Sequence, residues 1–351
     1  MRSAAGIAIA FILSVVASGP LQGASHLDAE IQRGLRATAA GEYDEALREF
    51  KAVVEEAPGD PRGYFFLASL YNILAGHFDD FSYREGFEKN AARVAAIADE
   101  RITEDPKDAE AYLLGGLAAG MRALDASRGK SYVRAFVRIR KTKRYLERAI
   151  ALNPKLEDAY YGLGIYYFWR TRAKWLRQLA PLLGDKGDIG IRYMRRVAKS
   201  GMWFKDLARI ELVYAFYADN KFSDARTLLA ELIEDYPNQP HYRFVHAEGY
   251  FIQKKYKRAR AMFRSLRARF RHIEGRIEEF YSDYAEWRIA RCDYRLGNKE
   301  IAQRVAVRVS AKPDLGSPLM RQVRKAAADL VQLIDNEEYV SDRFPVSKYR
   351  K

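Results

Sequence analysis

The chain has 351 residues, of which 48% are hydrophobic and 30% charged, a balance typical of a folded protein rather than a disordered one. Its formal net charge of +14 favours an acidic partner, such as an acidic protein, an anionic membrane or nucleic acid. The single cysteine, Cys292, excludes an intramolecular disulfide, and the common hydrolase, metalloprotease and phosphate-binding motifs are absent from the sequence. We therefore expect no catalytic residue, no metal site and no cofactor.

Residues 1–25 have the three parts of a secretory signal peptide. Arg2 precedes an uncharged apolar run from Gly6 to Ala17, and small residues follow up to Ala24, near which we expect cleavage. This apolar run is shorter than the roughly 20 residues that span a membrane. We expect an exported, periplasmic protein. The alternative is a chain that keeps this segment as an anchor in the inner membrane.

A pattern of small, aromatic and proline residues recurs with a period near 34 residues through residues 26–335. Its first occurrence carries Gly34, Gly41, Ala46, Phe50 and Pro58. The fifth occurrence is the most regular, with Val213, Phe216, Asn220, Phe222, Ala225, Leu229 and Pro237. Small residues allow helices to pack closely, glycine permits the turn between them, and proline ends the second helix.

This pattern resembles the tetratricopeptide repeat (TPR), and with the leader it is similar to exported bacterial TPR proteins. The resemblance implies an all-α, right-handed solenoid of about seven helix-turn-helix repeats. Ser317 and Pro318 predict the start of a C-terminal capping helix that runs to about Ile334. Residues 336–351 form a basic C-terminal tail.

Three insertions interrupt the pattern, near 76–90, 126–141 and 170–188. Tyr64 to Pro106 and Tyr112 to Pro154 each span 42 residues, where the uninterrupted pattern needs about 28. The added length amounts to two heptads. It can lengthen both helices of a repeat by about two turns, roughly 10 Å, or it can form a loop. Because repeats stack, we expect the insertions to lie along one edge of the solenoid.

The second and third insertions are rich in basic and aromatic residues. The basic residues that we expect along this edge are Arg134, Arg138, Arg140, Lys143, Arg170, Arg172, Lys174 and Arg177. Three interpretations remain open: the segment 128–177 docks on anionic lipid, it receives an acidic partner protein, or it is a solvated face whose aromatic residues pack between repeats. Nucleic acid is disfavoured as a partner, because an exported protein seldom meets it.

The resemblance also implies a concave groove lined by the first helix of each repeat. The residues that this frame places there are Phe65, Asn72, Tyr161, Phe168, Trp169, Tyr214, Tyr217 and Phe251. Asn72 could hold a peptide backbone and the aromatic rings could hold apolar side chains. The alternative is that these rings belong to the core between helices.

Together these features predict a non-catalytic scaffold of the cell envelope that binds a partner protein or peptide through the groove and the basic edge. The alternative is a peripheral membrane protein that docks on anionic lipid through residues 128–177.

Overall fold

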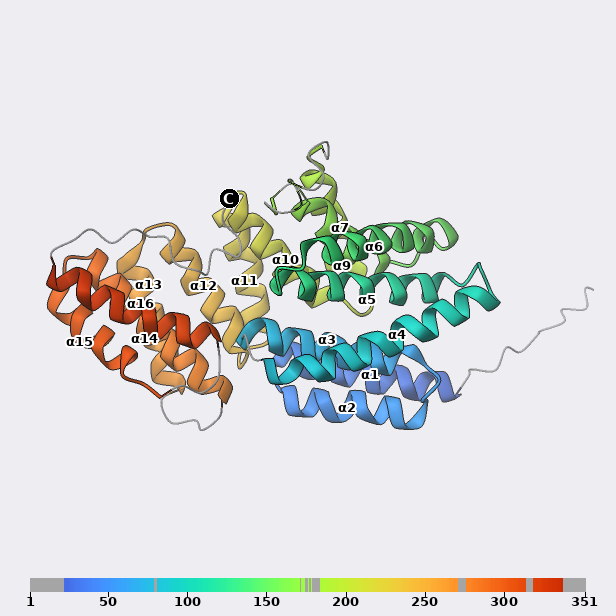
Figure 1. Cartoon of the computed structure of the whole chain (residues 1–351), viewed down its shortest axis with the longest axis horizontal. Coiled ribbons are helices and arrows are strands. Elements are labelled where there is room, and N and C mark those ends of the chain that lie inside the picture. Colours follow the sequence, from blue (N-terminus) through green and yellow to red (C-terminus); the bar gives the residue numbers. More distant parts are fainter. Residues whose placement is uncertain are drawn as a thin grey trace, which may run out of the picture.

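The computed structural model describes residues 22–78, 81–170, 172–173, 176, 178, 184–270, 276–313 and 318–336. These residues form fifteen α-helices and one short 3-10 helix, with no strand among them (Figure 1). Fourteen of the helices make seven consecutive pairs: α1 (Gln22–Ala40) and α2 (Tyr43–Glu56); α3 (Pro61–Phe78) and α4 (Arg84–Glu104), with η1 (Phe81–Tyr83) between them; α5 (Ala109–Arg128) and α6 (Tyr132–Leu152); α7 (Ala159–Trp169) and α9 (Gly187–Ser200); α10 (Lys205–Ala218) and α11 (Phe222–Asp235); α12 (Pro240–Ile252) and α13 (Tyr256–Phe270); α14 (Arg276–Arg295) and α15 (Lys299–Ser310). The last helix is α16 (Pro318–Asp335).

The predicted fold class is confirmed: seven helix pairs follow one another and α16 closes the array. Met320, Val323, Ala327 and Leu330 of α16 are buried, so this helix covers the last pair with an apolar face. Residues 1–21 and 337–351 lie outside the described part of the chain, and the leader and the basic tail stay predictions.

Close packing within the first pair depends on the small residue of the repeat pattern. A Cβ atom on Gly34 would lie 2.3–2.8 Å from ring atoms of Phe50, which is a contact that real structures do not tolerate. Phe50 is 1% exposed and Ala46 is 0% exposed, so the second helix presses its small and aromatic residues against α1.

The turns between the two helices of a pair share one backbone feature. Gly41, Lys130, Asn220, Lys254 and Gly297 all have positive φ, and each stands two residues before the second helix of its pair begins. Glycine adopts this left-handed conformation without strain, and asparagine tolerates it better than most residues. Lysine occupies the position in the third and sixth pairs, where the turn therefore also presents a cation.

The third pair is longer than a regular pair. α5 has 20 residues and α6 has 21, compared with 14 in each of α10 and α11. The added residues of this pair thus lie in the helices, which extend its hairpin beyond the length of the fifth pair.

The array curves so that its beginning meets its middle. Gln239, at the N-terminus of α12, is 3% exposed, and its Nε2 atom donates a hydrogen bond to the Ala39 carbonyl at 3.1 Å. Gln32 Nε2 in α1 donates to the Met202 carbonyl, just before α10, at 3.2 Å. Figure 1 shows the blue helices of the first pairs lying beneath the green and yellow helices of the middle of the chain. This curvature decides how much of the inner face stays open.

Candidate functional site: the edge of the third helix pair

Most of the side chains that were predicted to line a groove are buried. Phe65, Phe168, Tyr214, Tyr217 and Phe251 are each no more than 8% exposed. Asn72, Tyr161 and Trp169 are partly buried, and Asn72 Oδ1 accepts a hydrogen bond from Arg128 Nη1 at 2.9 Å. In this structure the inner aromatic rings pack against other side chains of the chain itself.

The pair Trp203–Phe204, just before α10, fills the inner side of the first half of the array. The ring of Phe204 stacks on Tyr161 of α7 at a centroid distance of 4.8 Å. It also meets Phe65 of α3 edge-on at 5.8 Å, while Trp203 meets Phe66 edge-on at 5.6 Å. The two rings thus join helices from three different pairs. Sequence reasoning missed this contact, since its only signal is a short apolar stretch between two repeats.

Asp158 holds this aromatic pair in place. Its carboxylate accepts hydrogen bonds from the backbone N–H groups of Met202 and Trp203 at 3.2 Å and of Phe204 at 3.1 Å. These N–H groups precede α10 and have no partner within the helix, so the carboxylate acts as a cap from a distant element. Asp158 is 4% exposed, and burial raises its pKa against the opposing effect of these hydrogen bonds.

In the second half of the array a buried ion pair joins α12 to α14. Arg288 donates to Glu248 through Nε at 2.5 Å and through Nη2 at 2.7 Å, and the two residues are 4% and 5% exposed. The Arg288 guanidinium also lies 4.5 Å from the centre of the Phe251 ring. Phe251, a predicted groove residue, is thus covered by an arginine of the next pair.

One carboxyl group on the inner side has no such partner. Glu211 of α10 is partly buried, no described residue donates a hydrogen bond to it, and burial raises its pKa to about 7. Its charge, together with burial, raises the pKa of Tyr161 well above its usual value. The inner side therefore combines apolar rings with an acid that titrates close to neutral pH.

We expect Glu211→Gln to change how stability depends on pH. In the native protein Glu211 keeps its proton up to about pH 7, whereas in the unfolded chain it loses the proton near 4.5, the ordinary pKa of glutamate. Between these values the unfolded state binds fewer protons, so the free energy of unfolding falls as pH rises. The variant should lack this fall, and between pH 4 and pH 8 it should gain about 3 kcal/mol over the wild type. Urea unfolding of both proteins at pH 4 and pH 8 measures this difference. If the variant shows the same pH dependence as the wild type, Glu211 does not titrate near pH 7.

Seven large hydrophobic side chains are exposed among the described residues, and four of them lie on the third pair. Leu124 at the end of α5 is 47% exposed, and Tyr132, Val133 and Val137 at the start of α6 are 40%, 71% and 62% exposed. Val133 and Val137 are four residues apart and so share one face of the helix. Within the described residues α7 has 11 residues against the 21 of α6, so it cannot cover α6 along its whole length.

Two free cations accompany these apolar side chains. Arg134 and Arg140 are exposed and form no ion pair with a described residue. We call the six residues Leu124, Tyr132, Val133, Arg134, Val137 and Arg140 the third-pair edge. An apolar surface with unpaired cations beside it is typical of an interaction site rather than of a solvated helix face.

The other residues of the predicted basic edge are bound within the protein. Arg138 donates to the Arg122 carbonyl at 2.9 Å, and Lys143 pairs with Glu147 at 2.6 Å. Arg170 is 6% exposed and donates to the Gly184 carbonyl through Nε at 3.0 Å. Arg172 pairs with Asp219 at 2.7 Å. Lys174 and Arg177 lie outside the described residues.

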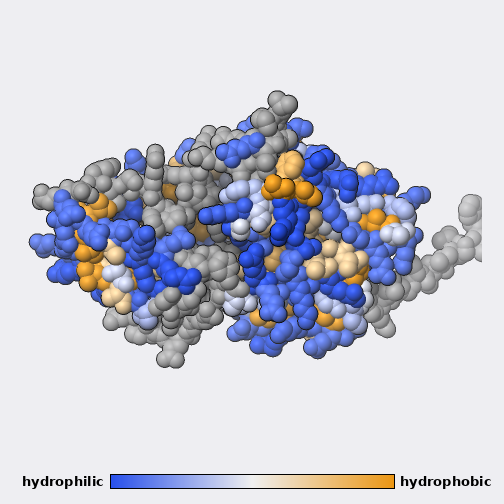
Figure 2. Space-filling model, viewed as in Figure 1, coloured by the Kyte–Doolittle hydropathy of each residue, from blue (hydrophilic) through white to orange (hydrophobic). Residues whose placement is uncertain are grey.

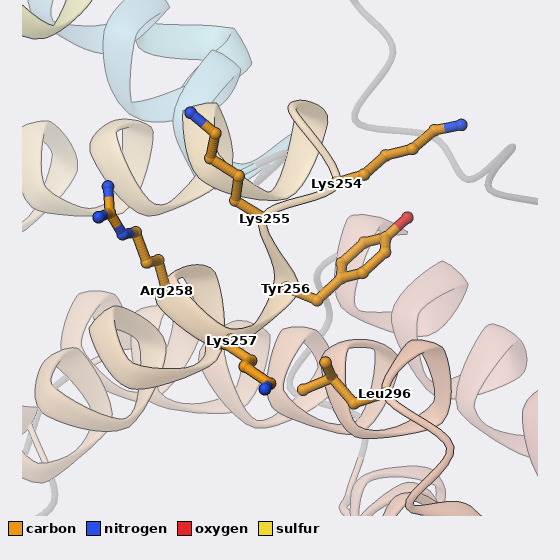
Figure 3. Close-up of a pocket in the computed structure, with 6 residues that line it drawn as sticks. All are labelled: Lys254, Lys255, Tyr256, Lys257, Arg258 and Leu296. Carbon is orange, nitrogen blue, oxygen red and sulfur yellow. The ribbon is translucent and has the colours of Figure 1, made fainter.

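A second basic surface surrounds the turn of the sixth pair. Lys254, Lys255, Tyr256, Lys257, Arg258 and Leu296 line an open depression of about 500 Å³. Figure 3 shows that Lys254 and Lys257 point to other sides than Lys255 and Arg258, and none of the four pairs with a described carboxylate. They add positive potential around the turn of the sixth pair, but they do not converge on a common point where a small ligand would bind.

Most of the coloured surface in Figure 2 is hydrophilic. On the face drawn in Figure 2, hydrophobic residues form small separate groups among hydrophilic ones. Among the helices of the described residues, none combines the length and the apolar character that crossing a membrane requires.

Comparison with known proteins identifies the repeat. Residues 208–238 match the family model described as tetratricopeptide repeat. No curated protein matches the chain.

Several solved structures are similar in fold. One is the crystal structure of PilW, described as a widely conserved type IV pilus biogenesis factor, which has 15% identity and a TM-score of 0.45 and covers 70% of this chain and 93% of its own. A tetratricopeptide repeat protein from Parabacteroides merdae has 13% identity and a TM-score of 0.41, covering 89% of this chain and 100% of its own. A thermophilic TPR protein of Thermus thermophilus has 17% identity and a TM-score of 0.38, and it covers 64% of this chain and 99% of its own.

The matching residues 208–238 lie almost entirely in α10 and α11, the pair in which the sequence pattern is most regular. The molecule is an all-α solenoid of seven helix pairs and a terminal helix, and its fifth pair matches the tetratricopeptide repeat model.

Proposed function

We propose that this protein is a non-catalytic scaffold that binds an acidic partner protein at the third-pair edge. The observation that carries the proposal is the exposure of Val133 and Val137, 71% and 62%, beside Arg134 and Arg140, which pair with no described carboxylate. Helix-pair solenoids present extended surfaces of this kind to other proteins.

The two kinds of side chain would contribute differently to binding. Burying an exposed valine contributes roughly 1.5 kcal/mol, so a partner that covers Val133, Val137 and Leu124 gains several kcal/mol from apolar contact. The arginines would steer an acidic surface toward the edge and set its orientation, because guanidinium groups bind carboxylates through two parallel hydrogen bonds. We infer from this division that the inner face stabilises the array while the edge meets the partner.

A second candidate occupant is an anionic membrane surface. Helices that present apolar and basic residues together also bind lipid headgroups, and Tyr132 at the start of α6 suits a membrane–water boundary. We favour the partner protein because the edge spans only a few turns of a helix pair, whereas lipid binding gains from a long amphipathic face.

We expect the charge reversal Arg134→Glu with Arg140→Glu to weaken capture of the partner by about tenfold or more and to reduce its dependence on salt. The test immobilises the purified chain and measures the proteins retained from an envelope extract at several salt concentrations. Arg138 is left unchanged, because its hydrogen bond to the Arg122 carbonyl gives it a structural role.

The matched control is Lys254→Glu with Lys257→Glu, which changes the net charge equally at the second basic surface. The proposal is supported if the control variant still retains the partner protein and the edge variant does not. It is overturned if both variants retain the partner equally. Vesicles of anionic and of neutral lipid distinguish the second candidate. Binding of the purified chain to anionic vesicles, lost in the edge variant, would assign the edge to lipid.

We also propose that the chain is exported to the periplasm, on the strength of the leader at residues 1–25. An edge that recruits a partner there would make the protein a component of the cell envelope.

A further inference from the structure

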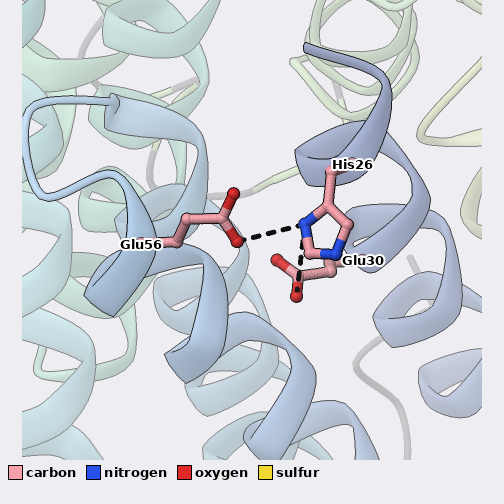
Figure 4. A group of neighbouring side chains, drawn as sticks. All are labelled: His26, Glu30 and Glu56. Carbon is pink, nitrogen blue, oxygen red and sulfur yellow. Dashed lines mark hydrogen bonds and ion pairs between the residues drawn. The ribbon is translucent and has the colours of Figure 1, made fainter. Parts of the chain in front are cut away.

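A histidine and two glutamates meet at the beginning of the array (Figure 4). His26 and Glu30 are four residues apart on α1 and so share one face of it, and Glu56 is the last residue of α2. His26 Nδ1 lies 3.1 Å from Glu56 Oε2 and 3.8 Å from Glu30 Oε1. One nitrogen or oxygen atom from each of the three residues lies within 4.8 Å of the other two.

The Glu30 carboxylate would be stabilised by a further positive group at this place. Its side chain is only 9% exposed, and its Oε2 atom is buried without a hydrogen-bond partner among the described residues. Its nearest permanent cation is Arg33, whose Nη2 atom lies 3.7 Å from Oε1. Arg33 is already bound to Glu49 at 2.9 Å through Nε. A buried carboxylate oxygen that lacks a partner is costly, so the environment favours a further positive group.

The surroundings of the cluster are also negatively charged. α2 ends in Glu55 and Glu56 and has no basic residue in its last turn, where the helix dipole already favours a cation. Two carboxylates and a neutral imidazole carry a charge of −2, which a divalent cation would neutralise.

We propose that His26, Glu30 and Glu56 bind one divalent transition-metal ion, for which Zn²⁺ is the best match. Zinc binds imidazole nitrogen and carboxylate oxygen at about 2.0–2.2 Å in tetrahedral geometry, which places neighbouring ligand atoms about 3.4 Å apart. The distances of 3.1 and 3.8 Å lie on either side of this value. A single imidazole with two carboxylates suits zinc better than calcium or magnesium, which prefer oxygen ligands alone. Since the His26 side chain is 60% exposed, water completes the fourth position.

The ion would join the start of α1 to the end of α2. Among the described pairs, the first pair has a consecutive neighbour on one side only, so a link between its two helices would add to the stability of this end. A metal that bridges its two helices binds the folded pair and not the unfolded chain, and it therefore stabilises the start of the solenoid. His26 follows the predicted leader and would remain after its removal.

The test titrates Zn²⁺ into the tag-free, chelator-treated chain by calorimetry. We expect the wild type to bind Zn²⁺ at this site and to unfold at a higher temperature when Zn²⁺ is present. His26→Ala and Glu56→Gln should each weaken binding by at least about tenfold and remove the thermal shift. Glu55→Gln is the matched control, because it removes the same charge from the neighbouring exposed residue and leaves the three ligands in place.

Circular dichroism confirms that each variant is folded, which exposed positions such as His26 and Glu56 should allow. X-ray absorption at the zinc edge should show one imidazole and oxygen ligands without sulfur. The proposal is overturned if the wild type does not bind Zn²⁺, or if His26→Ala and Glu56→Gln bind it as tightly as Glu55→Gln.

Discussion

Glu248→Gln should destabilise the protein by about 3–5 kcal/mol, the largest single effect that the structure predicts. The substitution leaves the Arg288 guanidinium buried, 4% exposed, without its carboxylate partner. Arginine stays charged in a protein interior, so it cannot relieve the cost by losing its proton. Urea unfolding monitored by circular dichroism measures the loss.

Two further variants test the cause of this effect. Arg288→Met should cost less than Glu248→Gln, since the remaining carboxyl can become protonated; burial already raises the pKa of Glu248. Glu45→Gln, which breaks the exposed pair of Glu45 with Arg48, should cost no more than about 1 kcal/mol. If Glu248→Gln costs as little as Glu45→Gln, the buried pair does not hold α12 to α14 as described.

Asp158→Ala should destabilise the protein by about 3 kcal/mol. It removes the acceptor of three buried or partly buried backbone N–H groups, those of Met202, Trp203 and Phe204, and each hydrogen bond contributes about 1 kcal/mol net. The loss should also free the Trp203 ring from Phe66. Denaturant unfolding gives the free energy, and tryptophan fluorescence reports the change around Trp203.

Asp158→Asn is the conservative comparison. Its amide oxygen can still accept from the same N–H groups, and the raised pKa of Asp158 indicates that the pocket tolerates a neutral side chain. We therefore expect Asn to recover more than half of the stability that Ala loses. Equal losses for Ala and Asn would mean that the carboxylate charge, rather than hydrogen bonding, fixes the segment before α10.

The helix pairs could be predicted because the signals that define them are local. Gly34 and Phe50 meet within one pair, and the positive φ of Gly41 and Asn220 lies in a turn that the 34-residue pattern marks. Such contacts join residues less than one repeat apart, so their spacing is visible in the sequence. The regular fifth occurrence of the pattern is also the segment that matches the repeat family.

The inner face and the cluster of His26, Glu30 and Glu56 could not be predicted, because they depend on contacts between separate helices. Phe204 contacts Phe65 across more than a hundred residues, and no repeat spacing relates the two. His26 and Glu30 do carry a local signal, a spacing of four on one helix, but their partner Glu56 comes from the next helix. The sequence frame assigned Phe65, Tyr214 and Phe251 to the inner side and left open whether they line a groove or belong to the core.

The basic edge was predicted from composition, which does not show which charges are already paired. Arg172 and Lys143 have nearby carboxylates, Asp219 and Glu147, whereas Arg134 and Arg140 have none among the described residues. Only the folded structure separates the cations that stabilise the chain from those that are free to meet a partner.

The central claim, that a partner protein binds the third-pair edge, is tested most directly by photo-crosslinking in the source cells. A benzophenone side chain is placed at Val133 and, as a control, at Val307 of α15, an exposed valine on another pair, 48% exposed. We expect a specific protein adduct from Val133 that disappears when Arg134 and Arg140 are reversed in charge, and no such adduct from Val307. The same adduct from both positions, or none from Val133 in a folded protein, would contradict the claim.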